Sequence, residues 1–184
     1  MKIIFYKTLL NGAKNLTPTE RIIYSFLVSK SITFIPDFFD SDGTCLNIDG
    51  VYEYVEDNHW IDLFPISIRK MANELNITQP TVINGMKKLR KLNYINDEYI
   101  FVDKELLING YFELHRLDLL TGQVLIFYSY IKHKAEMFSN SIDTYRSKLA
   151  ETLGIKIYSI NQYLAKLYKL NLIKRLNNGK LMIM

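Results

Sequence analysis

Two stretches of this 184-residue chain carry amide, hydroxyl and lysine side chains at the spacing of one helical face. Amide side chains of Asn and Gln pair bidentately with adenine, and Ser or Thr hydroxyls contact base edges or phosphates. The candidates for base contacts are Gln79, Thr81, Asn84 and Lys88 in the first stretch, and Lys156, Ser159, Gln162 and Lys166 in the second. The chemistry to expect is hydrogen-bonded recognition of nucleic acid.

A second set of side chains is purely cationic and follows the same two stretches. Lys and Arg that contact phosphates fix register and supply affinity without reading sequence. The candidates for phosphate contacts are Lys87, Arg90, Lys91, Lys169, Lys174, Arg175 and Lys180. Residues 66–95 carry six basic groups against one acidic group, and residues 142–175 carry seven against two. A face that is exposed only for solubility usually mixes both signs, so this bias favours an anionic partner.

The elements that must position these side chains occur twice. Residues 72–95 align without a gap with residues 150–173, and 9 of the 24 positions are identical. In each copy the long segment has an apolar stripe at helical spacing, Val82, Met86, Leu89 and Leu92 in the first and Ile160, Leu164, Leu167 and Leu170 in the second. Each copy predicts a short helix, a tight turn and a longer helix, the helix-turn-helix arrangement. Thr78 is expected to cap the first long helix.

The similarity extends upstream of both copies. Leu16-Thr17 and the residues after it recur 104 positions later as Leu120-Thr121, which predicts a first helix in each unit, capped by Thr17 and Thr121. The spacing between copies then falls from 104 to 78, so the first unit contains an insertion of 26 residues. Hairpins are predicted after each long helix: a short one over residues 94–102, and one with a two-residue turn at Asn178-Gly179.

The insertion lies in an acidic and aromatic segment, residues 31–65. This segment contains eight acidic residues, no Lys or Arg, and seven aromatic residues that include Trp60. Since the whole chain has a formal net charge of +4, the remainder carries +12. Short strands are expected at 44–48, 51–55 and 59–64 between turn-forming residues. We expect the segment to pack on the body or to form a homodimer contact, away from DNA, because phosphate would repel it.

With these elements in order, the chain resembles a tandem winged-helix protein. Residues 77–82, followed by Met86, Leu89, Leu92 and Tyr94-Ile95, resemble the turn, recognition helix and wing start of the MarR and GntR groups of bacterial transcription regulators. A duplicated winged helix behind Leu16-Thr17-Pro18-Thr19-Glu20 also resembles plasmid replication initiators of the Rep type. The resemblance implies a mainly α fold with small β-wings, in two tandem winged-helix units related by internal duplication. We expect unit 1 at residues 1–115, with the insertion at about 31–65, and unit 2 at residues 116–184.

Other chemistry is weakly indicated. Residues 38–44 (FFDSDGT) resemble the nucleophile motif of haloacid-dehalogenase-type phosphotransferases, but the alternating strand-helix scaffold and further acidic ligands are missing, and a turn is the favoured interpretation. The same string lacks the third oxygen ligand of an EF-hand loop. His59, His115 and His133 have no partner at metal-ligand spacing, and no Gly-rich phosphate loop is present.

Composition sets the expected compartment. Cys45 is the only cysteine, which excludes an intrachain disulfide and a thiolate metal cluster. The first residues lack a signal-peptide core, and the longest uncharged apolar stretch, residues 119–131, is too short to span a bilayer. A soluble cytoplasmic protein is the expectation.

These observations favour a non-enzymatic, sequence-specific protein that binds double-stranded DNA without a cofactor or metal. A transcriptional regulator is the first interpretation, and a plasmid or phage replication initiator that binds origin repeats is the second. A winged-helix scaffold that binds proteins through the acidic insertion is the third, and the basic faces disfavour it.

Overall fold

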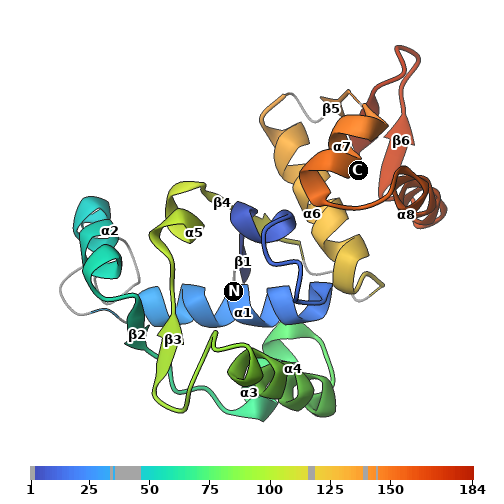
Figure 1. Cartoon of the computed structure of the whole chain (residues 1–184). Coiled ribbons are helices and arrows are strands. Elements are labelled where there is room, and N and C mark those ends of the chain that lie inside the picture. Colours follow the sequence, from blue (N-terminus) through green and yellow to red (C-terminus); the bar gives the residue numbers. More distant parts are fainter. Residues whose placement is uncertain (1–2, 34, 36–46, 116–118, 139–140, 144) are drawn as a thin grey trace.

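The chain forms a mainly helical structure with small antiparallel sheets (Figure 1). The computed structural model describes residues 3–33, 35, 47–115, 119–138, 141–143 and 145–184. The N-terminal half, residues 3–115, contains β1 (Ile3–Tyr6), the 3-10 helix η1 (Lys7–Leu10), α1 (Pro18–Ile32), α2 (Ile48–Asp57), β2 (Trp60–Asp62), α3 (Ile68–Leu75), α4 (Gln79–Lys91), β3 (Tyr99–Phe101), α5 (Lys104–Ile108) and β4 (Tyr111–Leu114). The C-terminal half, residues 119–184, contains α6 (Gly122–Glu136), β5 (Ser141–Ile142), α7 (Arg146–Leu153), α8 (Ile157–Lys169), β6 (Ile173–Arg175) and β7 (Leu181–Ile183).

The two halves share an order of elements with equal helix lengths. Helices α1 and α6 both have 15 residues and begin 104 positions apart. Helices α3 and α7 have 8 residues, α4 and α8 have 13, and both pairs begin 78 positions apart. The turn between the short and the long helix passes through a left-handed residue in each half, Asn76 and Gly154. These residues end the short helix and redirect the chain into the long one.

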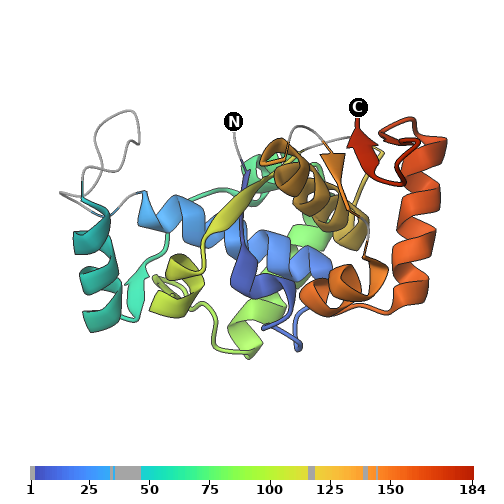
Figure 2. The ribbon, with the colours of Figure 1, turned by 90° about the horizontal axis from the view of Figure 1, so that it is seen from above.

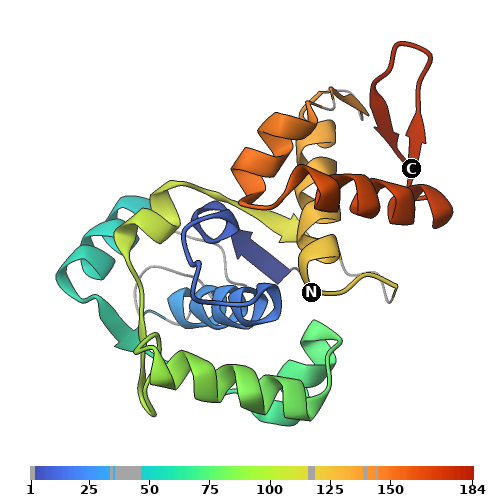
Figure 3. The ribbon, with the colours of Figure 1, turned by 45° about the vertical axis from the view of Figure 1, so that its right-hand side comes forward.

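A two-stranded sheet of the N-terminal half contacts the first helix of each half, α1 and α6. Strand β1 pairs antiparallel with β4, from Ile3 opposite Leu114 to Tyr6 opposite Tyr111. A fully buried serine ties each strand region to a first helix, α1 in the N-terminal half and α6 in the C-terminal half. Ser25 Oγ of α1 accepts the Tyr6 N–H at 3.1 Å, and Ser129 Oγ of α6 accepts the His115 N–H at 2.9 Å. Helices α1 and α6 contact each other beside this sheet (Figure 3).

The long helix packs on the first helix differently in each half. Gly85 of α4 lies so close to α1 that an added Cβ would meet Ile23 Cδ1 at 2.5 Å. At the corresponding spacing in the C-terminal half, Tyr163 of α8 packs on Phe127 of α6, with ring centroids 5.6 Å apart. The N-terminal crossing therefore uses a glycine for close approach, and the C-terminal crossing uses two aromatic rings.

The helix caps only partly follow the sequence prediction. Thr17 forms a capping box with Glu20, and the Thr78 hydroxyl accepts the Thr81 N–H, as predicted. Thr121 occupies the N-cap position of α6 as expected, but its side chain makes no cap hydrogen bond, so its predicted capping role is wrong.

The described part of the acidic segment, residues 31–65, contains only one of the three strands expected there. Residues 51–55 form part of α2, not a strand, because Asn47 caps the helix and the i, i+4 pair Val51 and Val55 is buried on one face. The expected strand at 59–64 is present as β2, which pairs with β3. The expected strand at 44–48 lies outside the described residues except for Asn47 and Ile48, which belong to the cap and first turn of α2. Cys45 and residues 38–44 also lie outside them.

Both predicted hairpins are present, one with a different turn. In the N-terminal hairpin the Asn96 N–H donates to the Tyr99 carbonyl at 2.9 Å, which closes a two-residue turn at Asp97 and Glu98. The C-terminal hairpin has a three-residue loop, residues 177–179, since the Leu176 N–H donates to the Lys180 carbonyl at 2.9 Å. The two-residue turn predicted at Asn178-Gly179 is therefore wrong. Gly179 takes a left-handed φ of 81° that lengthens the loop.

The close helix approach gives a first prediction. Gly85→Leu should lower the free energy of unfolding by about 2–3 kcal/mol, because the larger side chain forces α1 and α4 apart. Asn84→Leu is the control, since residue 84 is exposed on the same helix and should change stability by less than about 0.5 kcal/mol. Urea unfolding measures both variants. Equal effects of the two would contradict the tight crossing.

Candidate nucleic-acid interface

Helix α4 is held by its apolar stripe, which leaves a polar face outward. Val82, Met86 and Leu89 are buried. Of the predicted base-contacting residues, Gln79 and Asn84 are exposed, whereas Thr81 and Lys88 are half-buried. The Thr81 hydroxyl lies 2.8 Å from the Thr78 hydroxyl at the helix start. Asn84 and Gln79 are therefore more accessible to a partner than Thr81, whose hydroxyl contacts the capping residue Thr78.

Helix α8 has the same arrangement in the C-terminal half. Ile160, Leu164 and Leu167 are buried. Gln162 and Lys166 are exposed, and Ser159 is half-buried. Lys156 is exposed at the N-cap position, before the helix begins, and makes no side-chain cap bond. Each long helix thus exposes an amide near its middle, Asn84 on α4 and Gln162 on α8, and the neighbouring Asn161 of α8 is exposed as well.

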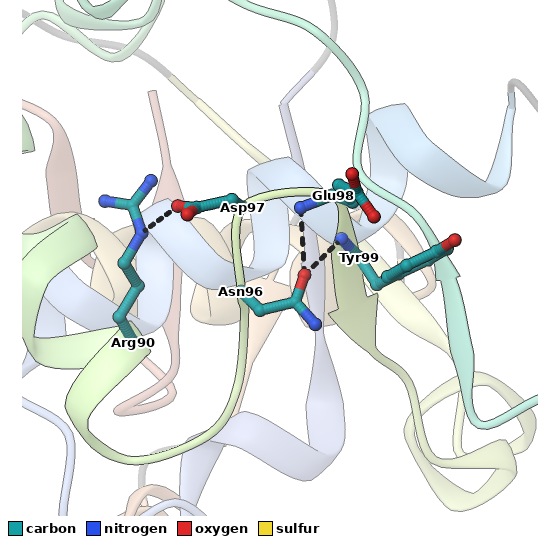
Figure 4. A network of polar contacts seen from close by, with 5 residues as sticks. All are labelled: Arg90, Asn96, Asp97, Glu98 and Tyr99. Carbon is teal, nitrogen blue, oxygen red and sulfur yellow. Dashed lines mark hydrogen bonds and ion pairs between the residues drawn. The ribbon is translucent and has the colours of Figure 1, made fainter.

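Within the described part of the chain, two of the seven predicted phosphate-contacting residues form ion pairs and the other five form none. Lys87, Lys91, Lys169, Lys174 and Arg175 are exposed. Arg90 Nε lies 3.3 Å from the Asp97 carboxylate, and Figure 4 shows the guanidinium turned toward the hairpin. Lys180 Nζ lies 3.6 Å from the Asp143 carboxylate. Both pairs are solvent-exposed, so each contributes little to stability and can be exchanged for another anion.

The hairpins that follow the long helices differ in charge. The N-terminal hairpin carries Asp97 and Glu98 at its turn, and the Asn96 Oδ1 accepts the N–H groups of Glu98 and Tyr99 at 2.9 and 2.6 Å (Figure 4). The C-terminal hairpin carries Lys174, Arg175 and Lys180. Phosphate would repel the first hairpin tip and attract the second hairpin.

The charge distribution separates the two ends of the molecule. Neither α4 nor α8 contains an acidic residue, whereas α2 contains four acidic residues and no basic one. Helix α2 and helix α8 lie at opposite ends of the molecule (Figures 1 and 2). Helix α2 packs near α5, where Lys104 pairs with Glu56. Its acidic groups therefore lie far from α8.

The aromatic residues of the acidic segment are partly accommodated within the chain. Trp60 packs edge-on against Phe101 with centroids 5.6 Å apart, and His59 stacks on the same ring at 5.8 Å. Trp60 nevertheless remains 41% exposed. A homodimer through this segment stays a prediction.

Four basic residues near the long helices were not among the predicted DNA contacts. Arg69 and Lys70 lie in the first turn of α3, and Arg146 and Lys148 lie in the first turn of α7; all four are exposed. Cations are unfavourable at a helix N-terminus by about 0.3–1 kcal/mol, since the helix dipole is positive there. Lys156 at the start of α8 has the same unfavourable position. Basic residues just after a predicted helix start were the available signal for these positions.

Two of the three histidines, His115 and His133, are near enough to interact electrostatically. His133 stacks on Phe112 with centroids 6.0 Å apart, and burial lowers the pKa of both His133 and His115. Within the described ranges, metal-ligating side chains do not gather in groups of three or more. None of the helices in those ranges is both long and apolar enough to cross a bilayer.

The chain matches no family model, no curated protein and no solved structure.

The caps of the two long helices give a second prediction. Lys156→Thr should raise the free energy of unfolding by about 0.5–2 kcal/mol, because a hydroxyl at the N-cap satisfies a free N–H and an adverse charge is removed. Thr78→Ala should lower it by a similar amount, since it removes the existing cap of α4. Thermal unfolding measures both. A destabilised Lys156→Thr variant would contradict the adverse placement of this lysine.

Proposed function

We propose that this chain is a non-enzymatic protein that binds double-stranded DNA sequence-specifically through two winged-helix units. The observation that carries the proposal is the paired presentation of α4 and α8. Each is fixed by a buried apolar stripe, exposes a central amide, and contains basic but no acidic residues. A helix held this way suits the major groove, where an amide pairs with adenine and flanking cations contact phosphates.

The order of elements supports the winged-helix assignment and an origin by duplication. In each half a first helix, a short strand, a short helix, a long helix and a hairpin follow one another, and the strand pairs with the second arm of the hairpin. The equal helix lengths and constant spacings of 104 and 78 residues are those of the sequence repeat. The insertion of 26 residues accounts for the change between the two spacings.

Transcriptional regulation is the role we favour for the DNA-binding protein. Replication initiation is the second candidate, favoured by the presence of two reading helices in one chain, which lets a single molecule occupy each repeat of an origin. Sequencing the DNA recovered with the purified protein separates them. Enrichment of one promoter supports regulation, repeated sites support initiation, and no enrichment would indicate a protein-binding scaffold.

A third prediction concerns salt. Duplex binding should weaken steeply with ionic strength, because each neutralised phosphate releases counterions and contributes a slope of about −0.9. With both halves engaged, about five to eight phosphate contacts are expected under that rule. Fluorescence anisotropy with a labelled duplex measures the slope between low and physiological salt. A flat response would refute the proposed function.

A fourth prediction concerns base readout. On a preferred site selected from random DNA, Asn84→Ala and Gln162→Ala should each cost about 1–3 kcal/mol of binding and relax preference at one position. Asn58→Ala is the control, because Asn58 lies at the end of α2 in the acidic segment. If either variant weakens binding equally on every sequence, that residue contacts the backbone instead of a base.

A further inference from the structure

A hollow of about 370 Å³ lies between α7, α8 and the C-terminal hairpin. Its polar lining comes from Arg146 at the start of α7, Asn161 and Tyr168 on α8, and Arg175 on β6, while Leu164 and Leu181 supply apolar walls. Of these polar residues, only Arg175 was predicted to contact phosphate. The site therefore brings together residues that are separate in the sequence.

The lining is strongly cationic. Two arginines line the hollow, and no acidic residue does. Within the residues that the structure describes, neither Arg146 nor Arg175 has an ion-pair partner. Two uncompensated cations beside one hollow repel each other in the free protein, and a bound anion removes this repulsion.

The chemistry of the lining selects a phosphate group. Guanidinium groups donate in a planar fork that matches phosphate oxygens, and they are less strongly hydrated than ammonium groups. The Asn161 amide and the Tyr168 hydroxyl add neutral donors. The long helix α8, which carries the predicted base contacts, forms one wall, so a duplex lying along α8 would bring its backbone to this hollow.

The N-terminal half has different residues at the corresponding positions. At the spacing of 78 residues, Arg146 and Asn161 correspond to Ile68 and Ile83, and Tyr168 and Arg175 correspond to Arg90 and Asp97. There the one cation is paired with the carboxylate at 3.3 Å (Figure 4). The position that is cationic and open in the C-terminal half is thus apolar and internally neutralised in the N-terminal half.

We propose that the hollow lined by Arg146, Asn161, Tyr168 and Arg175 binds one phosphate of the DNA backbone, and that the N-terminal half lacks an equivalent site. This inference rests on the proposed DNA-binding function. It adds that the two halves contact the DNA backbone differently. The C-terminal half contacts the backbone through both α8 and its hairpin. The N-terminal half relies on α4, because its hairpin tip is acidic.

The test compares charge-removing variants by anisotropy on one labelled duplex of mixed sequence, across a range of salt concentrations. Arg175→Gln should weaken binding by about 3- to 10-fold and reduce the salt slope by about 0.9, the contribution of one phosphate. The double variant Arg146→Gln/Arg175→Gln should still reduce the slope by only about 0.9, because both side chains hold the same phosphate. Unchanged thermal unfolding of the variants excludes loss of fold.

Lys174→Gln is the matched control. Lys174 is adjacent to Arg175 on β6 and does not line the hollow, yet its replacement removes the same charge. Combined with Arg146→Gln it should give additive losses. If the Arg146→Gln/Arg175→Gln pair instead reduces the slope by about 1.8, or if Arg175→Gln leaves affinity unchanged, the shared phosphate site is overturned.

A phosphorus NMR titration with inorganic phosphate distinguishes the source of the anion. Weak phosphate binding that disappears in Arg175→Gln, together with the loss of duplex affinity, supports the backbone site. Phosphate binding that depends on Arg175 while duplex affinity does not would assign the hollow to a small phosphate ligand and overturn the proposal. Absence of salt-dependent duplex binding in the unmodified protein would instead refute the proposed function itself.

Discussion

The antiparallel pairing of β1 with β4 is the constraint on which the rest of the arrangement depends. Strand β1 is tied to α1 through Ser25, and the chain just after β4 is tied to α6 through Ser129, so one small sheet fixes both first helices. The long helices pack on these two helices, α4 through Gly85 and α8 through Tyr163. The separation and relative direction of α4 and α8 are therefore set by buried contacts rather than by a linker. If both helices contact DNA as proposed, two elements held by buried contacts bind one duplex with less loss of entropy than two tethered ones.

Several helix starts beside the long helices carry cations that cost stability, although side chains cap α3 and α4. Lys156 occupies an N-cap where a hydroxyl is preferred, and Arg69, Lys70, Arg146 and Lys148 place cations at the positive ends of α3 and α7. Each choice costs part of a kcal/mol in the free protein. The same chain has favourable caps at Thr17 of α1, Ser67 of α3 and Thr78 of α4. Cations at these helix starts are expected if an anionic partner, as proposed, supplies the missing stabilisation.

Much of the fold follows from local sequence patterns, and the exceptions have physical reasons. The long helices and their buried stripes follow from periodicity, and the spacings of 104 and 78 residues place every helix of the repeat. The strand predicted at residues 51–55 was wrong. Val and Tyr favour strands, but the Asn47 cap and the tertiary burial of Val51 and Val55 select a helix. Periodicity placed five of the eight base-contact candidates on exposed faces, whereas Thr81, Lys88 and Ser159 are half-buried because neighbouring elements cover them. The Arg90–Asp97 pair and the hollow at Arg175 depend on how a hairpin folds back on a helix, which periodicity does not encode.

The differences between the halves have a consequence for how the proposed complex is oriented. A symmetric pair of reading units would bind a duplex equally well in either direction. Here the amide predicted to read bases is Asn84 on one long helix and Gln162 on the other, the adjoining hairpins have opposite charge, and the acidic helix α2 lies at the end opposite α8. Reversing the protein on its site would exchange the cationic hairpin for the acidic one against the same phosphates. The free-energy difference between the two directions then comes from electrostatics as well as from base contacts, so orientation persists even where the two half-sites are similar.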